Sequence, residues 1–339
     1  MIWKQVLGQV QEISASISII LNLLLILLIV TKSPKQLGTY KYLMIYISIF
    51  EILFSLIDAI VRPLIFSHGS IFICISTNFS IPKQFCVYLI SVWGGFFGSF
   101  MGLFALQFIY RYLVVRRSKT LETFKDSRIV LWMMIPPSFG LLWGSAAHFL
   151  LAPNPTIDRD IKSIVLEEFN WEIQNVAYVG PYVYPLAENG EIVINEKSLI
   201  AIIIVWTLVN TSIFTVAFFA IKCYLELNSD INASKSGRLN HLQHQLFYAL
   251  VTQTLIPLIL MHLPVSVLFL FTMFNLDLGH ASALVAMSVA VFPALDPIPV
   301  ILIIKNYRNA IANVVTIRVS MFSRREHTPV IRNTCETRI

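Results

Sequence analysis

Three of the charged side chains in the long apolar stretches of this chain need an explanation first. Glu51 and Asp296 are acids, and Arg111 lies between two tyrosines in FIYRYLVVRR. A charge inside a bilayer is costly to bury, and such residues usually mark functional sites. Two buried acids could share a proton or hold a cation. An arginine ending an apolar stretch could anchor that stretch or act on a partner, so the elements that position these residues must decide.

Composition places the chain among integral membrane proteins. Of its 339 residues, 56% are hydrophobic and 13% are charged, and the mean hydropathy is +0.72. A soluble domain carries about 25% charged residues. Most of this chain therefore lacks a side that faces water, as expected for a protein embedded in a bilayer.

Seven apolar segments are each long enough to cross a bilayer, which takes about 20 residues. Helices are expected because they satisfy their own backbone hydrogen bonds, and the short alternating segments of a membrane barrel are missing. The sequence predicts an all-α membrane protein, a seven-transmembrane helix bundle. The predicted spans are about 13–31, 41–66, 85–111, 128–152, 197–222, 245–275 and 281–304; residues 1–12 form a short extracellular N-terminus, 13–305 the membrane domain and 306–339 a cytosolic basic tail.

Lysine and arginine set the predicted orientation. Most of these 25 residues fall after the first, third and fifth spans and in the tail. The positive-inside rule then predicts the N-terminus outside and the C-terminus in the cytosol. This bias explains the net charge of +6, so we expect no nucleic-acid binding. The first span lacks a small-residue cleavage site and is expected to be retained.

The largest predicted outside loop, residues 153–197, is acidic. Within it, YVYPLAENGEIVINE places Asn189-Gly190 between two strand-like runs. Asn-Gly suits the tight turn of a β-hairpin, so we expect a small hairpin lying over the helix bundle. An irregular acidic loop is the alternative.

The first predicted outside loop carries two kinds of modifiable residue. Asn78-Phe79-Ser80 is a glycosylation triplet. Cys74 and Cys86 share the oxidising side. They could form a disulfide there, or they could remain two free, buried thiols.

Four local motifs, in order along the chain, narrow the class. They are LGTYKYLM (37–44), YRY (110–112), QLFYALVTQTLIP (245–257) and LDPIPVILIIKNYR (295–308). Over about residues 20–310 the chain resembles the Str class of nematode serpentine chemoreceptors, which includes the diacetyl odorant receptor. The resemblance implies a multi-pass protein of the plasma membrane, in the cilia of chemosensory neurons, that detects a small-molecule odorant or other chemical ligand and activates a heterotrimeric G protein.

The resemblance implies a G-protein contact at Tyr110, Arg111 and Tyr112, where Arg111 could also be only a membrane anchor. Rhodopsin-like receptors have an acid before this arginine, and here Tyr110 takes its place. The seventh-helix pattern reads Asp296-Pro297 and lacks its tyrosine, and the long outside loop has no cysteine for the usual bridge. Switch details from rhodopsin-like receptors therefore transfer only loosely.

Depth counting connects the two acids. Glu51 lies ten residues past Lys41, about 15 Å into the membrane, and Asp296 lies nine before Lys305, about 13 to 14 Å deep. In receptor bundles the second and seventh helices are neighbours. We therefore predict a switch network of Glu51, Asp296 and Pro297, in which proline permits bending. Two separately satisfied acids are the alternative.

A ligand pocket is expected in the outer half of the bundle, because such sites are concave and mostly apolar. For each candidate, packing is the alternative role. A simple ion pair with Asp58, four residues before Arg62, is the alternative for that arginine. Close helix approach is expected at Gly94, Gly95, Gly98 and Gly102. The candidates for ligand binding are Arg62, Tyr88, Trp93, Phe97, His148, Asn210 and His262.

The function predicted from these features is a G-protein-coupled chemoreceptor for a small molecule, not an enzyme. The sequence has no metal-ligand cluster, phosphate-cradling glycine loop or nucleophile elbow, so no metal or cofactor is expected. A seven-helix channel or transporter is the alternative from another class. Insect-type odorant channels, however, place the N-terminus inside, against the charge bias. The acidic outer loop favours a second alternative, a peptide-sensing receptor.

Overall fold

The computed structural model describes residues 2–34, 37–124, 126–185, 187, 191–232 and 237–313. Within them, seven helical segments are long and apolar enough to cross a membrane, which confirms the predicted bundle. The segments are α1 (Ile2–Lys32), α2 (Tyr40–Val61), α3 (Lys83–Val115), α4 with α5 (Ile129–Met133, Ile135–Leu150), α7 (Glu196–Asn232), α8 with α9 (Gly237–Pro257, Leu263–Met273) and α10 with α11 (Ala283–Leu295, Pro297–Ile303).

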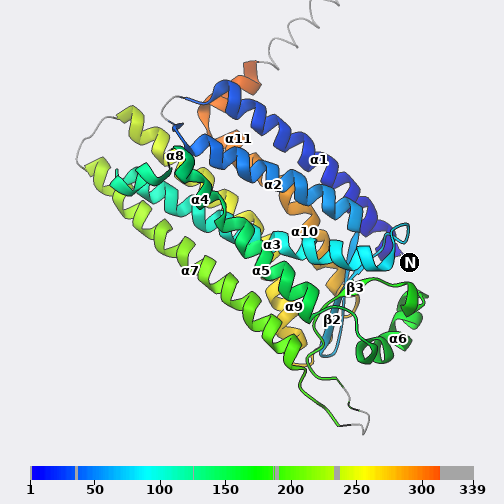
Figure 1. Ribbon diagram of the computed structural model, residues 1–339. Helices are drawn as coiled ribbons and strands as arrows, with labels where there is room; N and C mark the ends of the chain where they lie inside the picture. The colour runs from blue at the N-terminus through cyan, green and yellow to red at the C-terminus, as the bar shows by residue number, and fades with distance from the viewer. Residues whose placement is uncertain are drawn as a thin grey trace, which may run out of the picture.

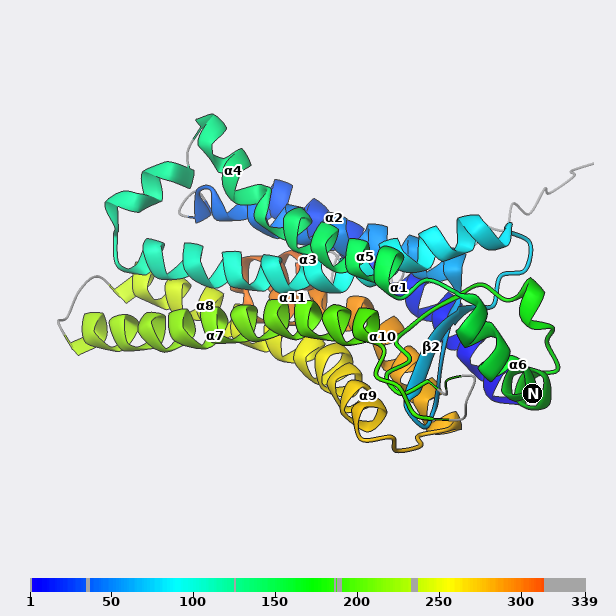
Figure 2. The ribbon, with the colours of Figure 1, turned by 60° about the horizontal axis from the view of Figure 1, so that its bottom comes forward.

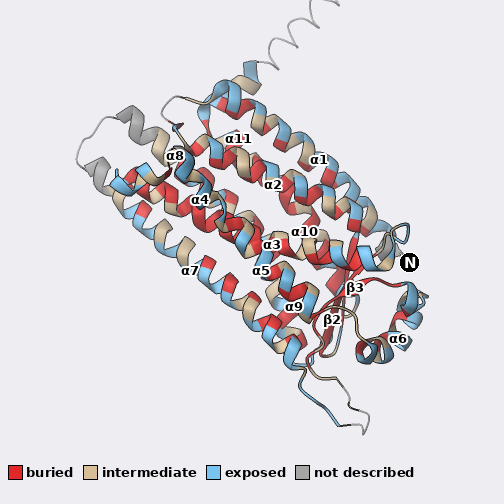
Figure 3. Cartoon of the chain, viewed as in Figure 1, coloured by how far each residue is buried: buried red, intermediate tan, exposed pale blue. Residues whose placement is uncertain are grey.

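Helix α3 runs through the middle of the bundle (Figures 1 and 2). It packs against α2, α5, α7 and α8. Most of α3 is buried, whereas the outer faces of α1, α5 and α7 carry exposed apolar side chains (Figure 3). Exposed apolar faces suit contact with lipid, while the buried helix is the element on which the others are assembled.

Small residues bring α3 and α5 together, as predicted for three of the four glycines. A Cβ atom added at Gly95 would lie 2.9 Å from the Gly140 carbonyl oxygen, and one at Gly98 would lie 2.6 Å from the Phe139 carbonyl oxygen. A Cβ at Gly102 would lie 2.8 Å from Pro136 Cα. At Gly94 the nearest atom would be 3.7 Å away, so this glycine is not required for close approach.

The second span is shorter than predicted, because its helix ends at Val61. Arg62 caps it in the left-handed conformation at φ 49°, and Pro63, which disfavours helix in the residue before it, begins a strand. Strand β1 (Pro63–His68) pairs antiparallel with β2 (Ile71–Ser76), in the register Pro63↔Ser76. The prediction that residues 62–66 continue the span is wrong.

The β-hairpin lies at one end of the bundle, next to α3, α9 and α10 (Figure 1). A short strand of the long outside loop, β3 (Tyr178–Val179), adds to β2 and completes a three-stranded sheet. The hairpin side chains from Pro63 to Ser67 and from Ile71 to Ser76 are buried. This sheet therefore belongs to the core at that end.

The long loop also contains a helix that the sequence analysis missed, α6 (Pro155–Phe169). Asn154 caps it, accepting a 3.0 Å hydrogen bond from the Ile157 amide, and Pro155 occupies the first helical turn. Further along, residues 183–187 and 191–195 are joined by backbone hydrogen bonds in an antiparallel pattern, as a hairpin requires. The predicted turn at Asn189-Gly190 lies outside the described residues.

The ends of the chain differ from the predicted division. Helix α1 begins at Ile2, so the expected N-terminal segment 1–12 is continuous with the first span within the described residues. At the other end, residues 305–313 are helical, and the rest of the predicted tail, 314–339, lies outside the described residues. Short 3-10 turns occupy Lys119–Phe124, Asp126–Arg128, Ile173–Asn175 and His280–Ser282.

The contact between α3 and α5 generates a stability prediction. Gly98→Ala places a methyl group against the Phe139 backbone, and overpacking of this kind costs about 1–3 kcal/mol. We expect a lower thermal midpoint of the detergent-solubilised protein, measured by a thiol- or tryptophan-fluorescence melt. Gly94→Ala is the matched control, because its new methyl group meets only ordinary contacts. Equal midpoints for the two variants would contradict the role assigned to Gly98.

Candidate functional site

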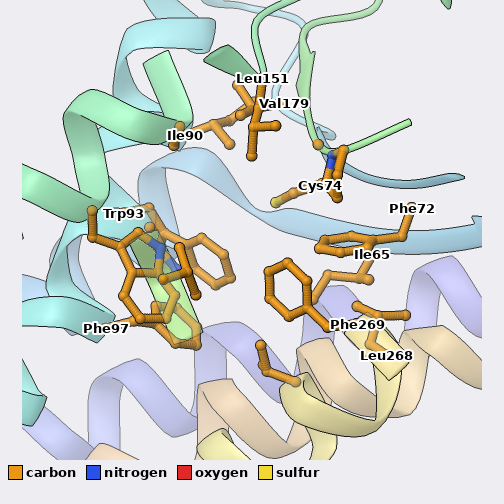
Figure 4. A pocket seen from close by; sticks show the side chains of 17 residues that line it. Ile65, Phe72, Cys74, Ile90, Trp93, Phe97, Leu151, Val179, Leu268 and Phe269 are labelled. Carbon is orange, nitrogen blue, oxygen red and sulfur yellow. The ribbon is translucent and has the colours of Figure 1, made fainter. Parts of the chain in front are cut away.

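The half of the bundle that carries the β-hairpin contains an apolar cavity of about 80 Å³. Figure 4 shows Trp93 and Phe97 of α3 on one side of it and Phe269 of α9 opposite. The hairpin supplies part of the wall, with the Cys74 sulfur directed toward the space. The lining residues are Ile65, Phe72, Cys74, Ile90, Trp93, Gly94, Phe97, Trp143, Ala147, Leu151, Val179, Gly180, Pro181, Val205, Val265, Leu268 and Phe269.

The hairpin closes the outer side of this cavity. Phe72 packs edge-on against Phe269, with ring centroids 4.9 Å apart. The Ser282 hydroxyl, at the start of the last span, donates to the Ile65 carbonyl at 2.9 Å, and the Gly279 amide donates to the Ser67 carbonyl at 3.1 Å. The hairpin is thus fixed to α9 and to the segment that leads into α10, and Gly180 and Pro181 of the long loop complete the cavity wall.

One carboxyl group lies beside the aromatic wall. Trp93 Nε1 donates a 2.9 Å hydrogen bond to Asp58 Oδ1, and Asp58 is only 2% exposed. The Cys74 thiol on β2 is also affected, because burial, and then the nearby Asp58 carboxylate, raise its pKa well above the ordinary value. The thiol therefore stays protonated at neutral pH, and the cavity wall at Cys74 is uncharged.

The predicted ligand residues fall into three groups. Trp93 and Phe97 line the cavity. Asn210 and His262 line an adjoining crevice of about 180 Å³ between α7 and α9. Tyr88 and His148 line a separate hollow between α3 and α5, among side chains on the outside of the bundle, and do not reach the cavity.

Arg62 lies away from these spaces. Its Nη2 atom binds Glu12 Oε1 of α1 at 2.7 Å, and both side chains are about half exposed. The ion pair predicted between Asp58 and Arg62 is wrong. The helix ends between them, so Arg62 turns outward while Asp58 points inward to Trp93.

Cys74 and Cys86 follow the second of the two alternatives, since both are free and buried. Cys74 faces the cavity, whereas the Cys86 thiol, in the first turn of α3, donates weakly to the Asn78 and Ile81 carbonyls at 3.8 and 3.7 Å. Asn78 is partly buried, and its amide donates to the Ile60 carbonyl at 2.8 Å. Its use as a glycosylation acceptor stays a prediction.

Below the cavity, the structure brings the two predicted acids together. Glu51 and Asp296 interact directly, and both are fully buried. Gln253 of α8 donates to Asp296 Oδ2, and Asn22 of α1 lies beside Glu51. The prediction rested on equal depth and on the neighbouring second and seventh helices of receptor bundles, and the structure adds that four helical segments meet at this point.

The sequence analysis missed Asn22 and Gln253, because uncharged polar residues in an apolar run give a weak signal. Asn22 donates to the Pro293 carbonyl at 3.3 Å. Pro297 directly follows Asp296 and begins α11, and its role in a switch network stays a prediction. One oxygen each of Asn22, Glu51 and Asp296 has no protein partner within the described residues, so each of the three side chains keeps an unused acceptor.

The sequence of α2 contains a pattern that predicts which of its faces turns toward the protein interior. Ser48, Glu51, Ser55 and Asp58 are spaced by three, four and three residues, which places them on one helical face. All four are buried. A polar stripe in an apolar helix indicates a face turned toward the protein interior, and it would have assigned Asp58 to the interior as well.

Arg111 lies near the C-terminal end of α3, away from the β-hairpin. This side chain is 1% exposed, and its Nη2 atom donates to the Gln243 backbone carbonyl of α8. Its Nε atom and both polar atoms of Gln107, one turn earlier, lack partners within the described residues. The arginine is therefore buried between α3 and α8, and its predicted contact with a G protein stays a prediction.

The flanking tyrosines have different surroundings. Tyr110 is buried and stacks on Tyr40 of α2, with ring centroids 5.6 Å apart. The Tyr112 hydroxyl accepts a 2.6 Å hydrogen bond from Arg116, which is exposed. Arg116 thus has the surface position expected of an anchor, in contrast to Arg111.

The comparisons with known proteins agree with the resemblance. Residues 7–312 match the family model described as serpentine type 7TM GPCR chemoreceptor Str. The chain is 35% identical to "G-protein coupled receptor str-217" of Caenorhabditis elegans, over 88% of this chain and 87% of that protein. It is 29% identical to "Serpentine receptor class r-10" of the same organism, over 92% and 91%.

The acid pair generates a prediction that can be tested on stability alone. Glu51→Gln and Asp296→Asn each replace one of two buried, adjacent acids by an amide that can donate to the other. We expect each change to raise the thermal midpoint of the purified protein. The gain in the free energy of unfolding should be smaller for the double variant than the sum of the two single gains, by about 1 kcal/mol.

Asp58 provides the control for this cycle, because it is a buried acid on the same helix about 10 Å further along. The effects of Glu51→Gln and Asp58→Asn on the free energy of unfolding should add. Strict additivity for Glu51 and Asp296 as well would show that they do not form one network.

Proposed function

The chain belongs to the Str family of serpentine seven-transmembrane chemoreceptors, and on this premise we propose that it detects a small, largely apolar molecule in the outer cavity and activates a heterotrimeric G protein. The observation that carries the proposal is the apolar cavity formed by α3, α5, α9 and the hairpin. Such spaces, lined by aromatic side chains with few polar groups, are typical of small-molecule sites.

The size of the cavity favours a ligand of few atoms. An apolar cavity of about 150 Å³ binds benzene, whereas drug-sized ligands occupy about 300–1,000 Å³. The cavity of 80 Å³ and the crevice of 180 Å³ fit the first class. Both spaces are much smaller than a peptide, which counts against the peptide-sensing alternative.

An aromatic cluster connects the cavity to the acid pair. Phe54 of α2 contacts Trp93 and Phe97 of the cavity wall and also Phe292 of α10. Phe54 lies one turn from Glu51, and Phe292 lies one turn from the other acid. We infer that ligand contacts at Trp93 are transmitted through Phe54 to the acids, which act as the switch network.

Arg111 is the proposed contact with the G protein. In the described state its head group is occupied by the Gln243 carbonyl. If α8 moves away from α3, the guanidinium becomes free to bind carbonyl groups at the C-terminus of a G-protein helix, which is the negative end of its dipole. Tyr110 and Tyr112 would border this contact.

The proposal includes a place and an orientation. We place the protein in the plasma membrane, with the N-terminus and α6 outside and the end of α11 in the cytosol, on the support of the positive-inside rule. A location in the cilia of chemosensory neurons and an odorant as ligand follow only from the family. The family's receptors act through partners and not by catalysis, so we propose no enzymatic activity.

The proposal is tested by expression in reporter cells exposed to small volatile alcohols, ketones and esters. We expect Cys74→Phe, which fills the cavity, to lower potency about tenfold or more at equal surface expression, because the added ring occupies the ligand's space. Cys74→Ala, which keeps the space open, is the matched control. A response that survives complete G-protein block would support the channel alternative instead.

Arg111 provides a test of coupling. We expect Arg111→Ala to lose nearly all ligand-evoked G-protein activation and Arg111→Lys to lose part of it, because lysine keeps the charge without the planar head. Arg116→Ala is the control, since Arg116 is exposed and bound to Tyr112. The measurement is G-protein activation normalised to surface receptor. Signalling at the parent level in Arg111→Ala would leave Arg111 a structural role only.

A further inference from the structure

The crevice beside the cavity has a chemical character of its own. It shares the side chains of Phe97, Trp143, Val205, Val265 and Phe269 with the cavity, so at most one layer of side chains separates the two spaces. From there it extends between α7 and α9. A molecule bound in the crevice would therefore contact the same aromatic wall that the cavity presents.

His262 gives this crevice a specific polar atom. The residue ends the π-helical turn between α8 and α9 and is 5% exposed. Its Nδ1 atom lies 3.0 Å from the Pro257 carbonyl oxygen. A carbonyl only accepts, so Nδ1 carries the hydrogen, and in neutral imidazole Nε2 is then an acceptor. Nε2 has no partner within the described residues.

Among the described residues, no other side chain of the crevice offers a buried acceptor without a partner, and the indole groups of Trp143 and Trp206 can only donate. The Asn210 amide donates to the Trp206 carbonyl of its own helix at 2.7 Å, and Asn210 is exposed. Ser266 is only partly buried. The remaining lining is apolar or aromatic. A buried acceptor without a donor is destabilising, so the crevice is suited to a molecule that brings a donor to His262.

We propose that the ligand is an apolar molecule with one hydrogen-bond donor, an alcohol or an N–H compound, that it donates this hydrogen to His262 Nε2, and that its apolar part lies along Phe97 toward the cavity. This inference rests on the proposed small-molecule function and narrows the ligand class. Ethers and ketones of the same size offer only acceptors, so they would leave two acceptors facing each other.

Binding to the purified, detergent-solubilised protein tests this proposal without any G protein. Primary hexanol and its isomer methyl pentyl ether have the same atoms and differ in the donor. By saturation-transfer NMR we expect hexanol to bind about tenfold more tightly, the effect of one hydrogen bond and one unsatisfied group. His262→Phe should abolish the preference and retain ether binding. His148→Phe, the same change in the separate hollow between α3 and α5, should keep the preference.

A second measurement covers the case in which His262→Phe does not fold. In wild-type protein labelled with ¹⁵N-histidine, hexanol should shift one acceptor-nitrogen signal, and the ether should not. An unchanged preference in His262→Phe, equal binding of both probes to wild type, or no binding of either would overturn the proposal; equal binding is also the result expected if a lipid chain fills the crevice. Hexanol binding without any cellular signalling would refute the proposed function and leave the His262 site intact.

Discussion

Inside a bilayer a polar group can bind only another group of the protein or enclosed water, and this constraint decides how the helices of this bundle are joined. At the outer level Asp58 accepts from Trp93 and joins α2 to α3. At mid-depth Asp296 lies against Glu51 and accepts from an amide of α8. At the inner level Arg111 donates to the backbone of α8. Because two of the three contacts include α8, a displacement of that helix must change both together.

The two halves of the sixth span, α8 and α9, make different contacts. The π-helical turn Leu258–His262 separates α9, which forms the wall of the cavity, from α8, which holds the acid pair and Arg111. Turns of this kind interrupt the regular hydrogen-bond ladder and occur frequently at functional sites. A ligand that repositions α9 would therefore act on the two inner contacts through this turn, while the close packing of α3 on α5 keeps the opposite side fixed.

The lengths of the apolar runs carried the prediction of the seven spans. Depth, together with the neighbouring second and seventh helices of receptor bundles, carried that of the two acids, because the rise of a helix converts residue counts into distance. The partners of Glu51 could not be found in this way, since nothing in an apolar run indicates which face Asn22 turns toward it. The β-hairpin was missed for another reason. Hydropathy does not distinguish helix from buried strand, and the local signal at Arg62-Pro63 was weighed less than the apolar run. The capping signal at Asn154 was likewise available and unused.

The replacement of an acid by Tyr110 changes how the closed state is held. In the part of the chain that the structure describes, Arg111 is not paired with a carboxylate, and its one hydrogen bond goes to a neutral carbonyl. A buried cation with so few partners is costly to keep. Tyr110 meanwhile stacks on Tyr40 and joins α3 to α2 instead of restraining the arginine. The closed state is therefore held by packing of the helices and not by an ion pair at Arg111. An outward movement of α8 would lose one hydrogen bond and relieve an unsatisfied charge, so the balance between the two states is set by how the apolar faces of α3 and α8 fit.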